Sequence, residues 1–319
     1  MKIVAATGLV LLTLISYRSV WTAAWVYEDA AAMNYSTRTL TYQTWRVVRS
    51  PLGSHLLSLS LFFLLSAAIL VLAHRLGVRG SGIWVIAVLW LLHPINVESV
   101  AYAASRGELL AALFIVAACI LATYDWWYTG VGIVACVIAA ALSKESGIVG
   151  LVLVSIIMAY FRYPVWQGPV IIATGILCIG VIDYGGLRTV ANIGTTSFVS
   201  ASAVSWVDWA GIQAAAARHW LVAIVWLQGL TPDPDIDIVS APGRWISAGI
   251  LASMGGIAWL IHHRLPVAAL GLSWFLLALL PRFVVQTPQS YLSAHHMLVP
   301  FIGLALTAGA LFEERICNQ

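Results

Sequence analysis

Long apolar runs alternate with short polar segments along almost the whole chain. They predict ten membrane-spanning helices, at about 3–24, 55–76, 80–95, 107–124, 129–143, 146–161, 168–184, 244–262, 265–281 and 297–313. A helix needs about 20 apolar residues to cross the hydrocarbon core. The runs at 80–95, 129–143 and 146–161 fall short, so we expect their connecting residues to lie below the membrane surface.

Two further segments predict helices that lie along the membrane on one face. Residues 39–49 have an amphipathic pattern, and the apolar run 212–230 is interrupted by Arg218 and His219. We interpret 212–230 as an interfacial or re-entrant helix, and if it crosses instead, every later segment changes side. The predicted fold class is an all-α polytopic membrane protein with nine to eleven transmembrane helices, and 1–319 form a single transmembrane domain.

Composition agrees with this class. Of 319 residues, 61% are hydrophobic and 9% are charged, and the mean hydropathy is +0.93, whereas a soluble domain carries about 25% charged residues. Membrane lipids are therefore expected around the chain. The net charge of +3 is too small to indicate a nucleic acid partner, and the four cysteines lack metal-ligand spacing.

Alternation of the predicted spans places nearly all the chemically active side chains on one side of the membrane. They are Glu28, Asp29, Arg38, His93, Glu98, Arg106, Lys144, Glu145, Arg218, His295 and His296. We call this the charged side. Its arginines and lysine would place it in the cytoplasm by the positive-inside rule alone.

The stretch 93–106 joins two apolar runs and carries several ionisable groups. Pro94 ends the third span at His93. If 96–106 is helical, Glu98, Tyr102 and Arg106 share one face at i, i+4 and i+8, and Glu108 follows as the next span begins. Ionisable residues at membrane depth are rare and usually functional. The alternative is a structural Glu98–Arg106 pair.

Other charged side chains also have both a functional and a structural interpretation. Glu28-Asp29 follows the first span and predicts a general base or ligands of a divalent cation, or else a solvated loop end. Lys144 at the tip of a short hairpin predicts a phosphate-binding ammonium group, or else a pair with Glu145. One of His295 and His296 is expected to contact an anionic group.

A carboxylate pair and several cations on one side suit an enzyme whose substrate is an amphiphile with an anionic head. In glycosyl transfer from a polyprenyl phosphate, cations stabilise the charge on the leaving phosphate, and a carboxylate deprotonates the attacking hydroxyl. Composition does not separate this enzyme from a transporter or flippase of a lipid-linked or anionic substrate.

Several motifs occur in the order found in one enzyme family. They are Val26-Tyr27-Glu28-Asp29, Arg38-Thr39-Leu40-Thr41, Pro51-Leu52-Gly53-Ser54, His93-Pro94-Ile95-Asn96-Val97-Glu98-Ser99, Ser105-Arg106-Gly107-Glu108, Ser143-Lys144-Glu145-Ser146-Gly147 and His295-His296-Met297-Leu298-Val299-Pro300. On these motifs the chain resembles the GT-C superfamily of polytopic glycosyltransferases. It is most similar to the membrane part of the transmembrane and tetratricopeptide-repeat O-mannosyltransferases and their bacterial relatives.

The resemblance implies a GT-C-like fold, a polyprenyl-phosphate sugar donor and a protein or glycan acceptor. Catalysis would rest on Glu28 and Asp29, which would also be the ligands of a divalent metal ion if the enzyme uses one. The donor's phosphate would contact Arg38, Arg106, Lys144, Arg218 and His296. The residues that surround and support these side chains would be His93, Glu98, Tyr102, Glu108, Glu145 and His295. The charged side would face outwards, in a bacterial inner membrane towards the periplasm or exterior.

Two departures limit the resemblance. The family usually has two aspartates where Glu28-Asp29 stands, so the base is open between the two residues. The repeat domain is absent from this sequence, so a partner protein would replace it. A catalytically inactive assembly subunit of the same fold is therefore a further alternative.

Overall fold

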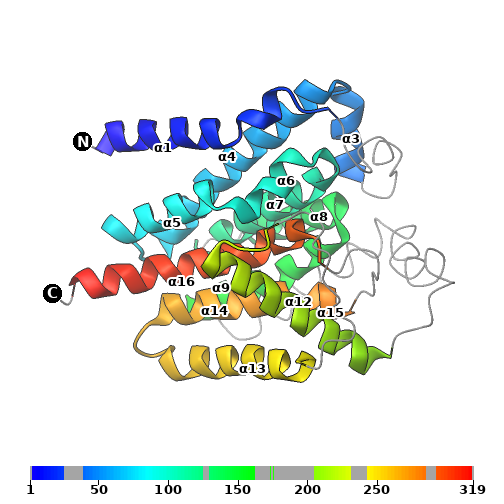
Figure 1. Cartoon of the computed structure of the whole chain (residues 1–319). Coiled ribbons are helices and arrows are strands. Elements are labelled where there is room, and N and C mark those ends of the chain that lie inside the picture. Colours follow the sequence, from blue (N-terminus) through cyan, green and yellow to red (C-terminus); the bar gives the residue numbers. More distant parts are fainter. Residues whose placement is uncertain are drawn as a thin grey trace.

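The computed structural model describes residues 2–24, 39–124, 129–161, 173, 175, 205–230, 243–284 and 292–317, and every regular element in these ranges is a helix. The elements are α1 (Lys2–Ser16), η1 (Arg18–Trp21), α3 (Thr39–Val47), α4 (Pro51–Arg75), α5 (Gly80–Leu92), η2 (Pro94–Asn96), α6 (Val97–Ala101), η3 (Ala103–Ser105), α7 (Arg106–Leu121), α8 (Thr129–Ser143), η4 (Glu145–Val149), α9 (Gly150–Tyr160), α12 (Trp206–Trp226), α13 (Arg244–Ile261), α14 (Pro266–Ala278), α15 (Leu280–Val284), η5 (Ala294–Met297) and α16 (Leu298–Cys317). They form one helical bundle (Figure 1).

Fewer helices than the predicted ten are long and apolar enough to cross a membrane. Within the described ranges there are five, Pro51–Arg75, Ala103–Leu121, Arg244–Ile261, Pro266–Val284 and Ala294–Ile316. A sixth span results if Gly80–Leu92 and Pro94–Ala101, which meet at 47°, count as one. These helices indicate a membrane protein, and the ten-span prediction is not confirmed.

The remaining predicted spans are shorter helices or lie outside the described residues. Ile3–Ser16, Thr129–Ser143 and Glu145–Tyr160 are apolar but shorter than a full span. The break at His93-Pro94 and the short hairpin at 129–161 were both predicted, and both are confirmed. The predicted span 168–184 lies outside the described residues except for residues 173 and 175.

Helix α16 lies in the interior of the bundle, where it packs mainly against α14 and α5. A glycine pair allows the close contact with α14. A Cβ on Gly303 would lie 2.4 Å from the carbonyl oxygen of Gly271, and a Cβ on Gly271 would lie 2.5 Å from that of Gly303. Small residues let membrane helices approach closely. This contact fixes the position of η5, which carries His295 and His296 just before α16.

The helix predicted at 212–230 is present as α12, which begins at Trp206, ends at Trp226 and is continuous through Arg218 and His219. Its early turn contacts the end of α15 through Trp209 Nε1, which donates to the Arg282 carbonyl at 2.9 Å. Its last turn contacts the end of α5, where His93 Nε2 lies 3.0 Å from the carbonyl of Ile224. A helix that joins the ends of two others in this way supports the interfacial interpretation.

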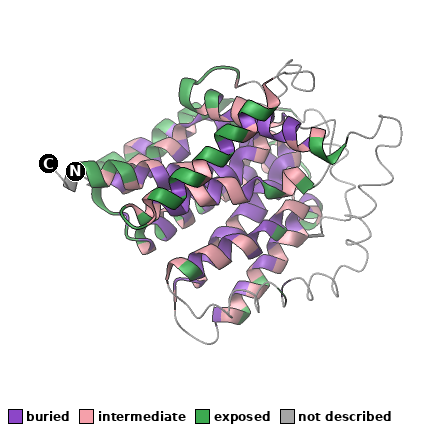
Figure 2. Cartoon of the chain, turned by 90° about the horizontal axis from the view of Figure 1, so that it is seen from below, coloured by how far each residue is buried: buried purple, intermediate pink, exposed green. Residues whose placement is uncertain are grey.

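The outer faces of the bundle are apolar. Exposed side chains lie on the outward faces of the peripheral helices (Figure 2), among them Ile3, which is 82% exposed, and Leu260, which is 78% exposed. An apolar surface of this extent suits contact with lipid rather than water. Both chain ends lie at the same end of the bundle (Figures 1 and 2).

Candidate functional site

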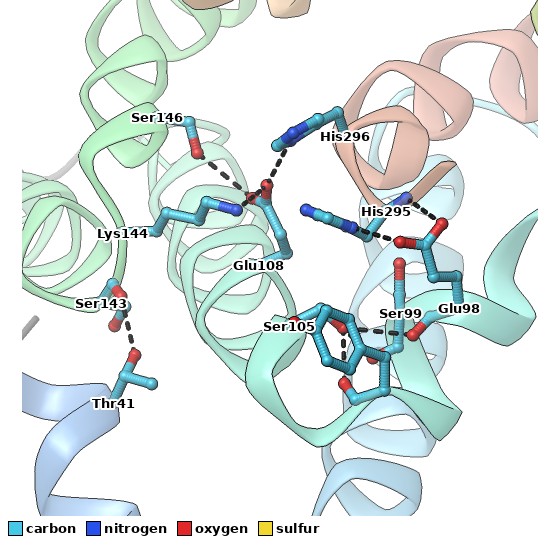
Figure 3. Close-up of polar contacts among 11 residues, drawn as sticks. Thr41, Glu98, Ser99, Ser105, Glu108, Ser143, Lys144, Ser146, His295 and His296 are labelled. Atoms are coloured by element: carbon cyan, nitrogen blue, oxygen red, sulfur yellow. Dashed lines mark hydrogen bonds and ion pairs between the residues drawn. The ribbon is translucent and has the colours of Figure 1, made fainter. Parts of the chain in front are cut away.

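Glu108 is the centre of a buried polar cluster formed by four segments (Figure 3). Its Oε1 lies 2.5 Å from Lys144 Nζ and 3.1 Å from His296 Nδ1, and its Oε2 accepts a hydrogen bond from Ser146 Oγ at 3.2 Å. The side chains of Glu108 and Lys144 are only 4% and 10% exposed. The contacts join the start of α7 to the α8–α9 hairpin and to η5.

A second carboxylate holds the neighbouring histidine. Glu98 Oε1 lies 2.5 Å from His295 Nδ1, and Glu98 Oε2 accepts the backbone N–H of His295 at 3.2 Å. The ring of Tyr102 lies beside that of His295, with 6.2 Å between centroids. Each of the two adjacent histidines therefore has its Nδ1 directed at a carboxylate, Glu98 for His295 and Glu108 for His296 (Figure 3).

The tip of the α8–α9 hairpin is shaped to bring Lys144 to Glu108. Gly147 turns back against α8 so closely that a Cβ there would lie 2.3 Å from the Ala140 carbonyl oxygen. The Lys144 backbone N–H still closes the last turn of α8 by donating to Ala140 at 3.0 Å. Lys144 is consequently 8% exposed, and the depth of this tip in the membrane stays a prediction.

Helix α3 is attached to the same hairpin. Thr41 Oγ1 donates to the carbonyl of Ser143 at 2.7 Å, so the first turn of α3 contacts the residue before Lys144 (Figure 3). Glu28, Asp29 and Arg38, the predicted catalytic pair and one predicted phosphate contact, lie outside the described residues. They precede Thr39, the first residue of α3, and α3 is attached beside the cluster.

Arg106 lies away from this cluster and is fully buried. Its guanidinium donates to Thr44 Oγ1 at 3.1 Å and to the Ser54 carbonyl at 3.1 Å, and it lies over the ring of Trp45 at 4.4 Å. These contacts hold α3 and α4 against the start of α7. The geometry supports a positioning role for Arg106, and contact with the donor's phosphate stays a prediction.

The prediction that Glu98, Tyr102 and Arg106 share one helical face is wrong. The segment is not one helix but α6 and η3 followed by α7. Glu98 is directed at His295, whereas Arg106 is directed at α3 and α4. The breaks before and after η3 rotate the two side chains away from each other.

His93 connects backbone segments. Its Nδ1 accepts the N–H of Ile95 at 3.1 Å, which leaves Nε2 to donate to the Ile224 carbonyl at 3.0 Å. The ring also packs on Phe301, with 4.9 Å between centroids. His93 thus supports the turn after α5 and the attachment of α12.

Arg218 also lies apart from the cluster in the described structure. Its Nε donates to Ser247 Oγ at 2.9 Å, which ties α12 to α13. An ion pair of 3.3 Å between Asp208 and Arg244 joins the beginnings of the same two helices. These contacts give Arg218 a structural role, and its contact with phosphate stays a prediction. Glu145 is half-buried at the hairpin tip, and Lys144 contacts Glu108, the partner that the sequence did not predict.

A narrow pocket opens beside His296. It is lined by Gln213, Ala216, Ala217, Leu279, Arg282, Phe283, Ser293, His296 and Met297. Arg282 interacts electrostatically with both Glu108 and His296. The pocket therefore brings a second cation close to the cluster.

Part of the cluster has the spacing of a metal site. One ligand atom each from Glu108, His295 and His296 lies within 4.8 Å of the others. Lys144 Nζ lies 2.5 Å from the same Glu108 carboxylate, so a metal ion bound here would share that carboxylate with a cation.

The sequence underrated Glu108 and did not single out Ser146, Arg282 or Gln213. Helix geometry alone could have separated Glu108 from Arg106. Two residues apart on α7, their side chains are rotated by about 200° around the axis, so they cannot serve the same site. Nothing in the local sequence marks Gln213, because only the packing of α12 brings it to the pocket.

Comparison with known proteins gives no relative. No family model, no curated protein and no solved structure matches the chain. The glycosyltransferase resemblance therefore rests on the motifs of the sequence.

Proposed function

We propose that this protein is a membrane glycosyltransferase that moves a sugar from a polyprenyl-phosphate donor to an acceptor hydroxyl. One observation carries the proposal: Lys144, at the tip of the short apolar α8–α9 hairpin, is buried against Glu108, near the start of the candidate span Ala103–Leu121. A buried cation at membrane depth is costly and usually functional. A lipid phosphate is an anion that arrives at this depth with an apolar tail.

The cluster would act on the leaving group. When the acceptor oxygen forms its bond to the anomeric carbon, the bond from that carbon to the phosphate oxygen breaks, and the phosphate takes the electron pair. Lys144 and Arg282 would stabilise this charge. Glu108 holds the ammonium of Lys144 in place, and Ser146 holds Glu108.

The base is proposed to be Asp29 or Glu28, which would accept the proton of the acceptor hydroxyl. Support for this comes from α3. Asp29 precedes Thr39 by ten residues, and α3 is attached to Ser143 beside Lys144. The carboxylates thus lie, in the sequence, shortly before a helix that is fixed next to the proposed phosphate site.

The test is transfer of a labelled sugar from a polyprenyl phosphate by the protein in phospholipid nanodiscs. We expect Asp29→Asn and Lys144→Ala to lose at least about 100-fold in rate. Arg46→Ala, which changes an exposed arginine of α3, serves as the control. Wild-type rates in both variants would contradict the proposal, and substrate flux through liposomes without a covalent product would indicate a transporter.

A further inference from the structure

Two buried nitrogen atoms in the pocket beside His296 have no hydrogen-bond partner. They are Gln213 Nε2 and His296 Nε2. Gln213 is only 4% exposed. A buried polar group without a partner destabilises a fold by about 1–3 kcal/mol, so two in one pocket indicate a ligand that supplies the missing partners.

The contact with Glu108 determines what His296 can bind. The carboxylate accepts from Nδ1 at 3.1 Å, so Nδ1 carries the proton and Nε2 has a lone pair. Lys144 Nζ lies against the same Glu108 oxygen, so a second proton on the ring would place another cation beside Lys144 in a nearly buried site, which is unfavourable. His296 Nε2 therefore needs a donor, whereas the Gln213 amide N–H needs an acceptor.

A hydroxyl group meets both requirements, because it donates one hydrogen bond and accepts others. Phosphate oxygens only accept, so they leave the lone pair of His296 unmatched. The size of the pocket agrees, since it has room for about one water-sized group. The walls beyond the two nitrogens include Leu279, Phe283 and Met297, which suit the apolar C–H edge of a ring.

We propose that the pocket between His296 and Gln213 binds one hydroxyl group of a carbohydrate. That the hydroxyl belongs to a sugar rests on the proposed function, whereas the requirement for a donor at one nitrogen and an acceptor at the other does not. Glu108 then has two roles: it holds Lys144 for the phosphate and fixes the tautomer of His296 for the sugar. The one cluster would thus position both the phosphate and the sugar, which are joined by the bond that breaks.

The experiment measures binding of hexyl glycosides, and of their singly deoxygenated analogues, to the protein in phosphatidylcholine nanodiscs. For one glycoside we expect about tenfold weaker binding when one particular hydroxyl is removed. Gln213→Leu should weaken binding of the parent glycoside by about the same factor and abolish the effect of removing that hydroxyl. Gln43→Leu, at an exposed position of α3, should change neither.

Stability gives a second measurement. Gln213→Leu removes a buried nitrogen without a partner, so the melting temperature should stay the same or rise. Binding that is equal in wild type and Gln213→Leu, or equal for every deoxygenated analogue, would overturn the proposal, as would a pocket that holds only water. Sugar transfer without glycoside binding would overturn this inference alone, and glycoside binding without transfer would overturn only the transferase.

Discussion

Lys144 and Glu108 form an ion pair inside the bundle. Both are nearly buried, and their charged atoms are 2.5 Å apart. A buried pair adds little net stability, but removal of one partner leaves an uncompensated charge. The pair therefore couples the binding site to the fold.

The Lys144→Ala variant should show this coupling. We expect a loss of about 3 kcal/mol in the free energy of unfolding, because Glu108 keeps its burial and loses its cation. The double variant Lys144→Ala/Glu108→Gln should lose less than the sum of the two single variants, by about 1 kcal/mol or more. Thermal unfolding in detergent measures both, and strict additivity would contradict the coupling.

Arg106→Lys tests whether Arg106 positions helices or contacts the donor. Lysine cannot reproduce the fork that reaches Thr44 and Ser54, nor the same stacking on Trp45. We expect a loss of about 2 kcal/mol in the absence of any substrate. The matched control is Arg46→Lys at an exposed site, with a change below about 0.5 kcal/mol. Full stability with lost transfer would instead make Arg106 a phosphate contact.

At the scale of elements, the hairpin of α8, η4 and α9 sets the depth of the site. Its two helices are too short to cross a membrane by themselves, and the turn at Gly147 brings Lys144 inwards. The motif Lys-Glu-Ser-Gly thus combines the cation that we propose binds phosphate with the glycine that allows its position. Serine in the same motif supports the carboxylate partner.

Gly147→Ala should displace this turn. The added Cβ would lie 2.3 Å from the Ala140 carbonyl, which belongs to backbone and cannot move away freely. We expect a loss of about 2–3 kcal/mol in stability and a loss of transfer activity. Gly130→Ala, in the same α8 and with nothing within 4 Å, should be neutral or stabilise the helix slightly. Similar melting temperatures for the two variants would contradict this account of the turn.

Across the whole molecule, the polar cluster and the chain ends lie at opposite ends of α16. The helix begins directly after His296 and ends at Cys317, and its 20 residues span about 30 Å. Both termini are at the far end of the bundle from the cluster (Figure 1). The side of the membrane that Cys317 faces therefore reports the side of the site.

Labelling of Cys317 by an impermeant thiol reagent in intact cells checks the orientation. If the cluster faces outwards as proposed, we expect labelling only after permeabilisation. Cys119 is buried in the bundle, and a Cys317→Ser variant corrects for signal from the other cysteines. Labelling of Cys317 in intact cells would place the cluster in the cytoplasm and contradict the proposed orientation.

The sequence by itself determined where several helices lie and where some of them end. The proline after His93 and the polar tip at Lys144 are local features, and they mark the ends of α5 and α8. The breaks around η3 have no such local mark. The apolar runs determined that this is a membrane protein, because a surface with so few charges cannot be solvated by water.

Only the tertiary structure decided which side chains meet. Lys144 pairs with Glu108, which is distant in the sequence, and Arg106 contacts α3 and α4. Each residue along a helix rotates the side chain by about 100°, so a single break such as the one at η3 redirects everything after it. Contacts between α7, the α8–α9 hairpin and η5 join segments far apart in the chain, and only the packing of these helices determines them.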